Sequence, residues 1–210
     1  MTRGRRRWII GGAVAVGTAV LLYCVPPFRV VPLDVSRQRA KAAFDPATFV
    51  DRFWTERLIP AAGRAVDAAE LLTLARRDRQ AARRTYGRSV GLGGVYYYFV
   101  AGVGRVVSAD GNTVGLALSD GGERVQVLLE AGPIFGNAVR DGTGLLDVNG
   151  FPNSQDFNAL SAEINRRIEQ RVLPDLRRMA TVGARVRFVG CAEIMDEDAD
   201  LNPLRIVPFI

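Results

Sequence analysis

The chain's longest uninterrupted apolar segment lies at its start. Trp8 to Val25 contains no charged residue, and four arginines precede it: Arg3, Arg5, Arg6 and Arg7. As a helix the segment would rise about 27 Å, close to the thickness of a bilayer's hydrocarbon core. Because flanking positive charge stays in the cytoplasm, we predict a cytoplasmic tail over residues 1–7 and a transmembrane anchor over 8–25. The remaining chain then lies on the periplasmic side of the bacterial cytoplasmic membrane.

Two other uses of this segment stay open. A cleaved signal peptide needs small residues before the cut, and Tyr23, Pro26 and Pro27 fit that requirement poorly. Cys24 stands where a lipid could be attached, although Tyr23 replaces the small residue that normally precedes such a cysteine. We therefore prefer the uncleaved anchor, followed by a proline-containing linker over residues 26–45.

Apolar residues at helical spacing then predict a helical arm over residues 46–88. Asp45 is a suitable cap, and Pro46 fits the first helical position, where its missing N–H costs nothing. The apolar stripe of this first helix ends at Pro60, and its members are Phe49, Phe53, Trp54 and Leu58. A second helix is predicted from about Gly63 to Tyr86.

The second helix carries a basic side. Its members are Arg76, Arg77, Arg79, Arg83, Arg84 and Arg88. Such a side can bind anionic lipid head groups or an acidic partner, or it can be a solvated face with Asp78 among the arginines. The solvated face is preferred because no aromatic residue is interleaved with the arginines.

From Gly87 onward the apolar pattern changes to a period of two, which is typical of strands. Turn signals at 110–112 and 120–122 divide it into strands at about 96–108, 113–119 and 124–130. Gly102 and Gly104 lie inside the first strand, where glycine often marks a bulge. They resemble the start of a dinucleotide loop, but Val107 occupies the third glycine position and no helix follows. We therefore expect no cofactor.

The last third of the chain completes an α+β pattern. Asn153 or Ser154 caps a predicted helix over residues 154–180, and strands follow at 184–194 and 204–209. Three strands, a helix and two strands is the order of a five-stranded OB-like β-barrel with a helix between strands 3 and 4. The predicted domains are therefore the helical arm and an OB-like domain over residues 89–210.

Composition removes several function classes. The formal charge of +6 includes the four arginines before the anchor, so the remaining chain has 24 basic against 22 acidic residues. That balance argues against nucleic-acid binding. The absence of histidine excludes histidine-based triads and histidine zinc sites. Cys24 and Cys191 cannot form a disulfide framework, and Cys191 fits a small buried residue of a strand.

An acidic loop over residues 195–203 is a candidate metal site. Asp196, Asp198 and Asp200 alternate like the first ligands of a calcium loop. Leu201 then replaces the required glycine, and Val207 stands where the bidentate glutamate belongs. A solvated hairpin tip is the preferred interpretation.

Three further segments carry a resemblance to a known family. They are GPIFGNAVRD at 132–141, NGFPNSQDF at 149–157 and INRR at 164–167. They resemble the signature of bacterial predicted periplasmic lipoproteins that contain a domain of unknown function. The resemblance implies an extracytoplasmic, membrane-attached protein, often encoded beside sugar ABC-transporter genes. It implies no activity.

Polar residues of these segments are the candidate ligand site. They are Arg140, Asp141, Asn149, Asn153, Gln155 and Asp156. One hypothesis is a pocket for a small polar ligand such as a sugar, held by Arg140 and the amides. The preferred alternative is internal: Arg140 pairs with Asp141 or Asp156, and the amides satisfy backbone groups of a long loop.

The sequence therefore predicts a non-catalytic, membrane-anchored accessory or adaptor protein. Its expected partners are the membrane and a solute-transporter subunit or another envelope protein. A sugar-binding module is one alternative. A hydrolase that uses Asp141 and Asp156 as acid and base is the other, and it is weak because no nucleophile–base pair is visible.

Overall fold

The structure is a computed structural model that describes residues 44–90, 94–119, 121–151 and 153–210. The predicted cytoplasmic tail, the anchor and Cys24 lie outside the described residues, as do residues 26–43 of the linker. Within the described ranges, no helix combines the length and the apolar character that crossing a bilayer requires. Residues 45–210 form one unit, so the helical arm and the strands belong to the same body.

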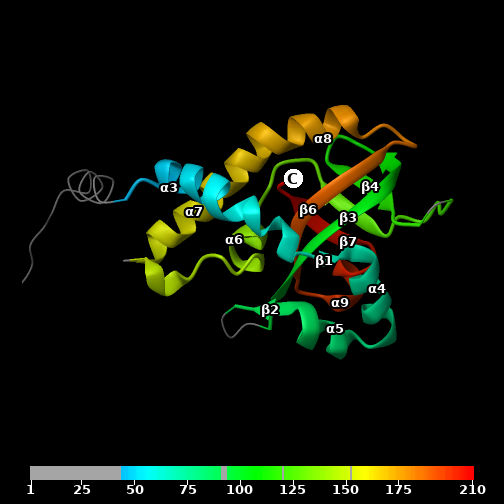
Figure 1. Ribbon diagram of the computed structural model, residues 1–210, viewed down its shortest axis with the longest axis horizontal. Helices are drawn as coiled ribbons and strands as arrows, with labels where there is room; N and C mark the ends of the chain where they lie inside the picture. The colour runs from blue at the N-terminus through cyan, green and yellow to red at the C-terminus, as the bar shows by residue number, and fades with distance from the viewer. Residues whose placement is uncertain (1–43, 91–93, 120, 152) are drawn as a thin grey trace, which may run out of the picture. The chain divides into compact units, whose positions relative to one another are not determined.

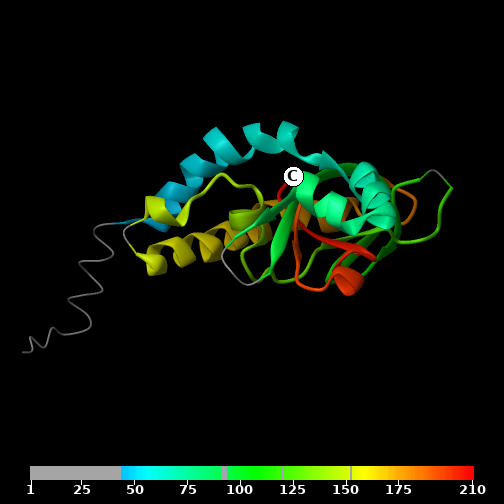
Figure 2. The same ribbon diagram turned by 90° about the horizontal axis from the view of Figure 1, so that it is seen from below.

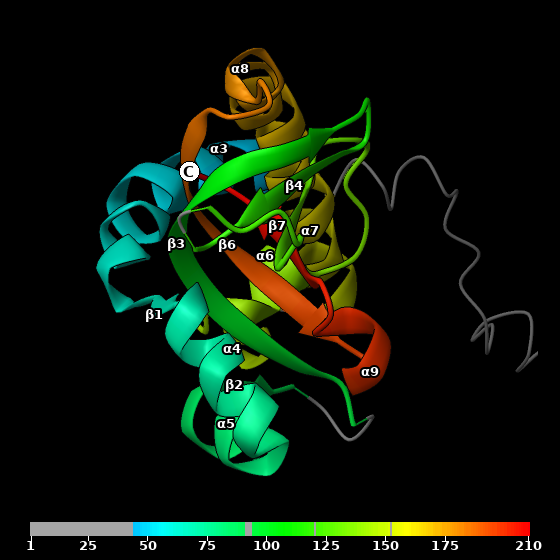
Figure 3. The same ribbon diagram turned by 90° about the vertical axis from the view of Figure 1, so that its right-hand side faces the viewer.

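Five main strands follow one another along the chain in the order that the sequence predicts. They are β3 (Tyr96–Ala109), β4 (Thr113–Ala117), β5 (Val127–Glu130), β6 (Arg185–Ile194) and β7 (Leu204–Pro208). Strand β3 pairs antiparallel with β4 and β6, β5 pairs with β4 and in parallel with β7, and β6 pairs with β7. Each of the five therefore has two neighbours, and Figure 3 shows β3 and β6 crossing the unit side by side.

Two short strands escaped the sequence prediction. β1 (Val66–Asp67) pairs in parallel with β3, and β2 (Gly87–Ser89) pairs antiparallel with it. They lie on either side of helices α4 (Ala68–Arg77) and α5 (Arg79–Tyr86) in the chain and hold the helical arm against the strands. Two or three residues give no period that a sequence pattern could reveal.

The predicted bulge lies at a different position. Strands β3 and β6 stay in register through Gly102 and Gly104, whereas the register with β4 shifts between Val106 and Ser108. Gly102 instead makes room for a core side chain, because a Cβ atom there would lie 2.8 Å from the ring of Phe188. These glycines therefore allow close packing of neighbouring side chains, and they do not form the bulge.

Seven α-helices surround the strands in the described residues. They are α3 (Pro46–Phe53), α4 (Ala68–Arg77), α5 (Arg79–Tyr86), α6 (Ala138–Gly142), α7 (Ser154–Arg167), α8 (Leu173–Met179) and α9 (Glu197–Asp200). The predicted cap of α3 is confirmed, since Asp45 accepts a hydrogen bond from the Ala47 N–H at 3.0 Å. Asn153 caps α7 through the Asp156 N–H at 2.8 Å. A π-helical turn, Ile168–Val172, joins α7 to α8, so the predicted helix 154–180 is interrupted.

The predicted single helix from Gly63 to Tyr86 is wrong. Pro60–Arg64 is a 3₁₀ helix, and the segment from Ala68 onward is divided into α4 and α5 at Asp78. Asp78 has an extended backbone, with φ −153° and ψ 100°, and its side chain accepts from the Ala81 N–H at 2.9 Å. An aspartate can end one helix and cap the next in this way, and a count of apolar positions does not detect it.

The helices lie on two sides of the strands. Figures 1 and 3 show α7 and α8 along one side and α4 and α5 on the other. The core between them contains Leu116, Leu129, Ile164, Phe188 and Ile206, each fully buried.

A buried arginine joins α7 to α3, which lie beside each other in Figure 2. Arg167, only 3% exposed, donates to the Asp51 carboxylate at 2.5 Å and to the Ala47 carbonyl at 2.8 Å. It also pairs with Glu163 at 3.0 Å. Partners from two helices thus fix the start of the helical arm.

Candidate functional site

Helix α6 contains the most deeply buried ion pair in the described structure. The Arg140 guanidinium donates to both carboxylate oxygens of Asp141, at 2.7 and 2.9 Å, and each residue is 6% exposed. The same guanidinium donates to Asn158 Oδ1 at 3.0 Å and lies 4.1 Å from the centre of the Phe157 ring. All faces of Arg140 are therefore occupied, which is the internal arrangement that the sequence left open. Burial of this guanidinium argues against a sugar site built on it.

Three of the other four predicted ligand residues form hydrogen bonds in or beside the loop that precedes α7. Asn149 donates to Asp147 at 2.9 Å, and Asn153 donates to the Asp156 carboxylate at 2.9 Å. Gln155 is exposed on the first turn of α7. Asp141 and Asp156 bind different partners, so the structure does not bring them together as an acid–base pair.

The family-like segment Gly132–Asn137 is held in place by α7 and by the π-helical turn that follows it. Glu169 accepts a hydrogen bond from the Ile134 N–H at 2.7 Å, and the Asn165 side chain donates to the Gly136 carbonyl at 3.0 Å. Gly136 has a φ of +80°, which lets the chain turn between these two contacts. The loop is therefore fixed on both sides of Phe135.

Phe135 itself points into solvent. Its exposed fraction is 81%, and Met195, after β6, is 76% exposed. Both line one hollow of about 180 Å³, together with four charged residues. We define the Phe135 surface by these six residues: Phe135, Met195, Glu130, Glu193, Asp200 and Arg205. A large aromatic side chain that its backbone holds in water is typical of a contact site.

Buried groups support the Phe135 surface from below. Gly142 of α6 packs on β6, where a Cβ atom would lie 2.9 Å from the Cβ of Cys191. Burial raises the pKa of the Cys191 thiol, which is consistent with a small core residue and not a nucleophile. The predicted role of Cys191 as a buried strand residue is confirmed.

The charge at the rim of the Phe135 surface is mainly negative. Glu130 pairs with Arg205 at 2.7 Å, whereas Glu193 and Asp200 have no ion-pair partner in the described residues. Burial raises the pKa of Glu193, and the negative charge of Asp141 adds to the effect, although a hydrogen bond from Tyr97 opposes it. The apolar pair thus lies beside two unbalanced carboxyl groups.

The acidic residues of the predicted calcium loop have separate structural roles. Asp196 caps α9, Asp198 pairs with Arg79 at 2.6 Å, and Asp200 accepts from the Met195 N–H at 2.8 Å. Across the residues that the structure describes, no three histidine, cysteine, aspartate or glutamate side chains converge as a metal site. The carboxylates point to different partners, so the arrangement gives the calcium hypothesis no support.

Sequence reasoning missed Phe135 and Met195 as functional candidates. The candidate site was built from the polar residues of the family-like segments, because polar groups carry most chemistry. The available signal was Phe135 between the turn residues of Gly132-Pro133 and Gly136-Asn137, since turn residues place a side chain at the surface. Nothing in the local sequence marks Met195.

Comparisons with known proteins agree with the architecture. A family model described as "Predicted periplasmic lipoprotein (DUF2291)" matches residues 18–210. A solved structure described as an OB-fold protein from Thermotoga maritima MSB8 is similar at a TM-score of 0.69 and 23% identity. The match covers 79% of this chain and 96% of that one, and it shows the fold alone. No curated protein matches the chain.

Proposed function

Since this chain belongs to the family of predicted periplasmic lipoproteins, we propose that it is an extracytoplasmic accessory protein that docks on a membrane partner through the Phe135 surface. The observation that carries the proposal is the 81% exposure of Phe135 on a loop held by Glu169 and Asn165. Exposing an aromatic ring costs the hydrophobic stabilisation that its burial would give. Contact with a partner recovers it.

The charges around Phe135 define the kind of partner. Glu193 and Asp200 border the hollow and have no ion-pair partner among the described residues, since Arg205 pairs with Glu130. A complementary surface therefore presents lysine or arginine around an apolar pocket that receives the ring. We propose that the partner is an extracytoplasmic part of a solute-transporter subunit or of another envelope protein. The sugar ABC transporters that the family resemblance implies are the first to test.

The proposed role is non-catalytic and depends on attachment to the membrane. The Trp8–Val25 segment, kept as an anchor or processed at Cys24, would hold residues 45–210 beside membrane proteins. The OB-like barrel would then be the rigid body that presents the docking loop. The structural roles of Arg140 and Asp141 favour this reading over a hydrolase.

Site-directed photo-crosslinking of the full chain in its own membrane tests the proposal. A photoreactive amino acid at position 135 should give one discrete adduct with an integral membrane protein, identified by mass. The matched control places the same amino acid at Val182, which is 70% exposed and does not line the hollow. Position 182 should give no such adduct.

A paired substitution measures the contribution of the surface. Phe135→Ser with Met195→Ser should lower the co-purified partner at least about tenfold, because hot-spot side chains each contribute 2 kcal/mol or more, by a rough general estimate. Val182→Ser should leave it unchanged. Equal adducts at 135 and 182, or full partner retention by the double variant, would refute the proposal.

A further inference from the structure

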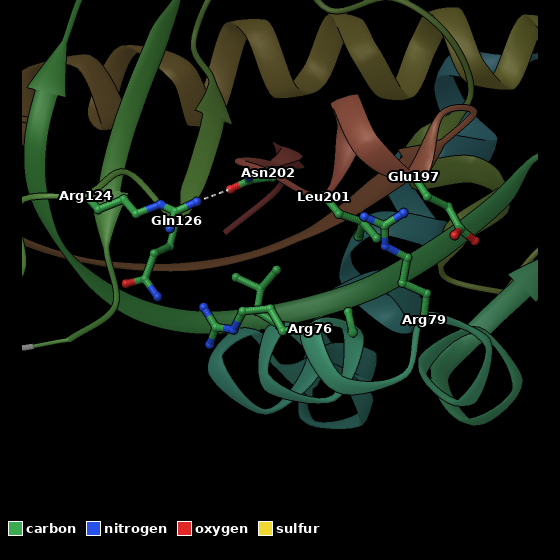
Figure 4. Close-up of a pocket in the computed structure, with 9 residues that line it drawn as sticks. Arg76, Arg79, Arg124, Gln126, Glu197, Leu201 and Asn202 are labelled. Carbon is green, nitrogen blue, oxygen red and sulfur yellow. Dashed lines mark hydrogen bonds between the residues drawn. The ribbon is translucent and has the colours of Figure 1, made fainter.

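Three arginines from two parts of the chain surround one pocket on the side of the strands that α4 and α5 cover. Arg76 lies at the end of α4, Arg79 at the start of α5, and Arg124 shortly before β5. The pocket has a volume of about 220 Å³, and Figure 4 shows Arg76 and Arg124 reaching toward it from opposite sides. Its apolar lining comes from Leu72, Ala75 and Leu201.

Two of the three guanidinium groups have no ion-pair partner in the described structure. Arg76 donates only a long hydrogen bond, 3.4 Å, to the Thr73 hydroxyl, and Arg124 donates to Asn202 Oδ1 at 2.8 Å. Arg79 differs, because Asp198 lies 2.6 Å away. The neutral amide of Asn202 positions Arg124 without neutralising it, so positive charge remains at the pocket.

The carboxylate that lines the pocket is engaged elsewhere. Glu197 lines the pocket and accepts a hydrogen bond from the Tyr96 hydroxyl at 2.9 Å. In Figure 4 its carboxyl group turns away from Arg76 and Arg124. The electrostatic balance of the pocket therefore favours an anion.

We propose that this pocket binds a phosphomonoester on a small organic body. Guanidinium groups bind phosphate oxygens in pairs, and a phosphomonoester carries a charge near −2 at neutral pH, which matches the two unpaired arginines. The side chains of Leu72, Ala75 and Leu201 contact the organic part. The same chemistry occurs in a free sugar or glycerol phosphate and in the head group of phosphatidic acid.

Calorimetric titration of the full chain in a mild detergent tests the inference and separates the two sources. The probes are glycerol 3-phosphate and short-chain phosphatidic acid, with glycerol and short-chain phosphatidylcholine as uncharged or zwitterionic controls. We expect saturable binding of at least one phosphomonoester and none of the controls. Binding of glycerol 3-phosphate indicates a free metabolite, and binding of phosphatidic acid alone indicates a lipid head group.

Substitutions then locate the site. Arg124→Gln should weaken binding about tenfold or more, the usual effect of removing one charge-assisted contact, and the double variant with Arg76→Gln should weaken it further. Arg77→Gln is the matched control, because Arg77 is exposed on the same helix and does not line this pocket. Unchanged unfolding midpoints exclude misfolding as the cause. Absence of saturable phosphomonoester binding, or an equal loss in Arg77→Gln, would overturn the inference.

Discussion

Two regions of this protein differ in how their arginines are paired and buried. In α6, Arg140 is buried and its guanidinium is completely occupied by Asp141, Asn158 and the Phe157 ring. In the pocket beside α4, Arg76 and Arg124 are exposed and have only neutral hydrogen-bond partners in the described residues. The first arrangement joins α6 to α7. The second leaves charge available to a ligand, so residue type alone does not distinguish a structural from a binding arginine.

Breaking the buried pair should have the largest effect. Arg140→Met leaves Asp141 as a charge without its partner in a site where only 6% of the residue is exposed. We expect a loss of about 3–5 kcal/mol in the free energy of unfolding. Urea unfolding of the full chain measures it, and a loss below 1 kcal/mol on the same rough scale would show that water reaches Asp141.

Adding a methyl group at Gly142, where α6 packs on β6, should have the next largest effect. Gly142→Ala places a Cβ atom 2.9 Å from the Cys191 Cβ and 3.0 Å from its sulfur. Overpacking of this kind costs about 1–3 kcal/mol. The double variant with Cys191→Ala should recover part of the loss in a thermal melt, because only the sulfur contact is removed. If the double variant is no more stable than Gly142→Ala, the strain does not come from the contact with the Cys191 sulfur.

The raised pKa of Glu193 predicts a smaller, pH-dependent effect. The folded protein binds the Glu193 proton more tightly than the unfolded chain does, so stability falls as the pH rises from the ordinary carboxyl pKa of 4.5 through the higher folded-state pKa. Glu193→Gln removes this change. The difference in melting temperature between variant and wild type should therefore grow across that window and then level off. A constant difference would contradict the pKa shift.

Neutralising the pocket arginines should have almost no effect on stability. Arg76→Gln and Arg124→Gln remove exposed charges that form no ion pair with any residue the structure describes, and such changes usually stay within about 0.5 kcal/mol. Urea unfolding of each variant without phosphate checks this expectation. A larger loss would mean that the pocket is a structural site like α6, and the contrast between the two regions would disappear.

Local patterns in the sequence predicted much of the fold. Alternating apolar residues located the five main strands, and Asp45 and Asn153 marked helix starts, because strand faces and caps depend on near neighbours. The division at Asp78 and the short strands β1 and β2 were missed. They depend on a single capping side chain and on pairing with β3, at positions up to 34 residues away in the chain.

The candidate sites were less predictable. The sequence left Arg140 open between a ligand contact and an internal pair and preferred the pair, which the structure forms with Asp141. It described Arg76 and Arg79 as part of a solvated face. Arg124 joins those two only because β5 pairs with β7, which brings the start of β5 near the 201–202 turn. No spacing along the chain contains that information.

The sequence by itself determined the order of the five main strands, the helix between the third and the fourth, and the family, since these follow from apolar periodicity, capping and motif residues. The tertiary structure alone decided which arginines are neutralised and which aromatic ring faces water. The physical reason is that burial and charge pairing depend on segments that meet only after the chain has folded.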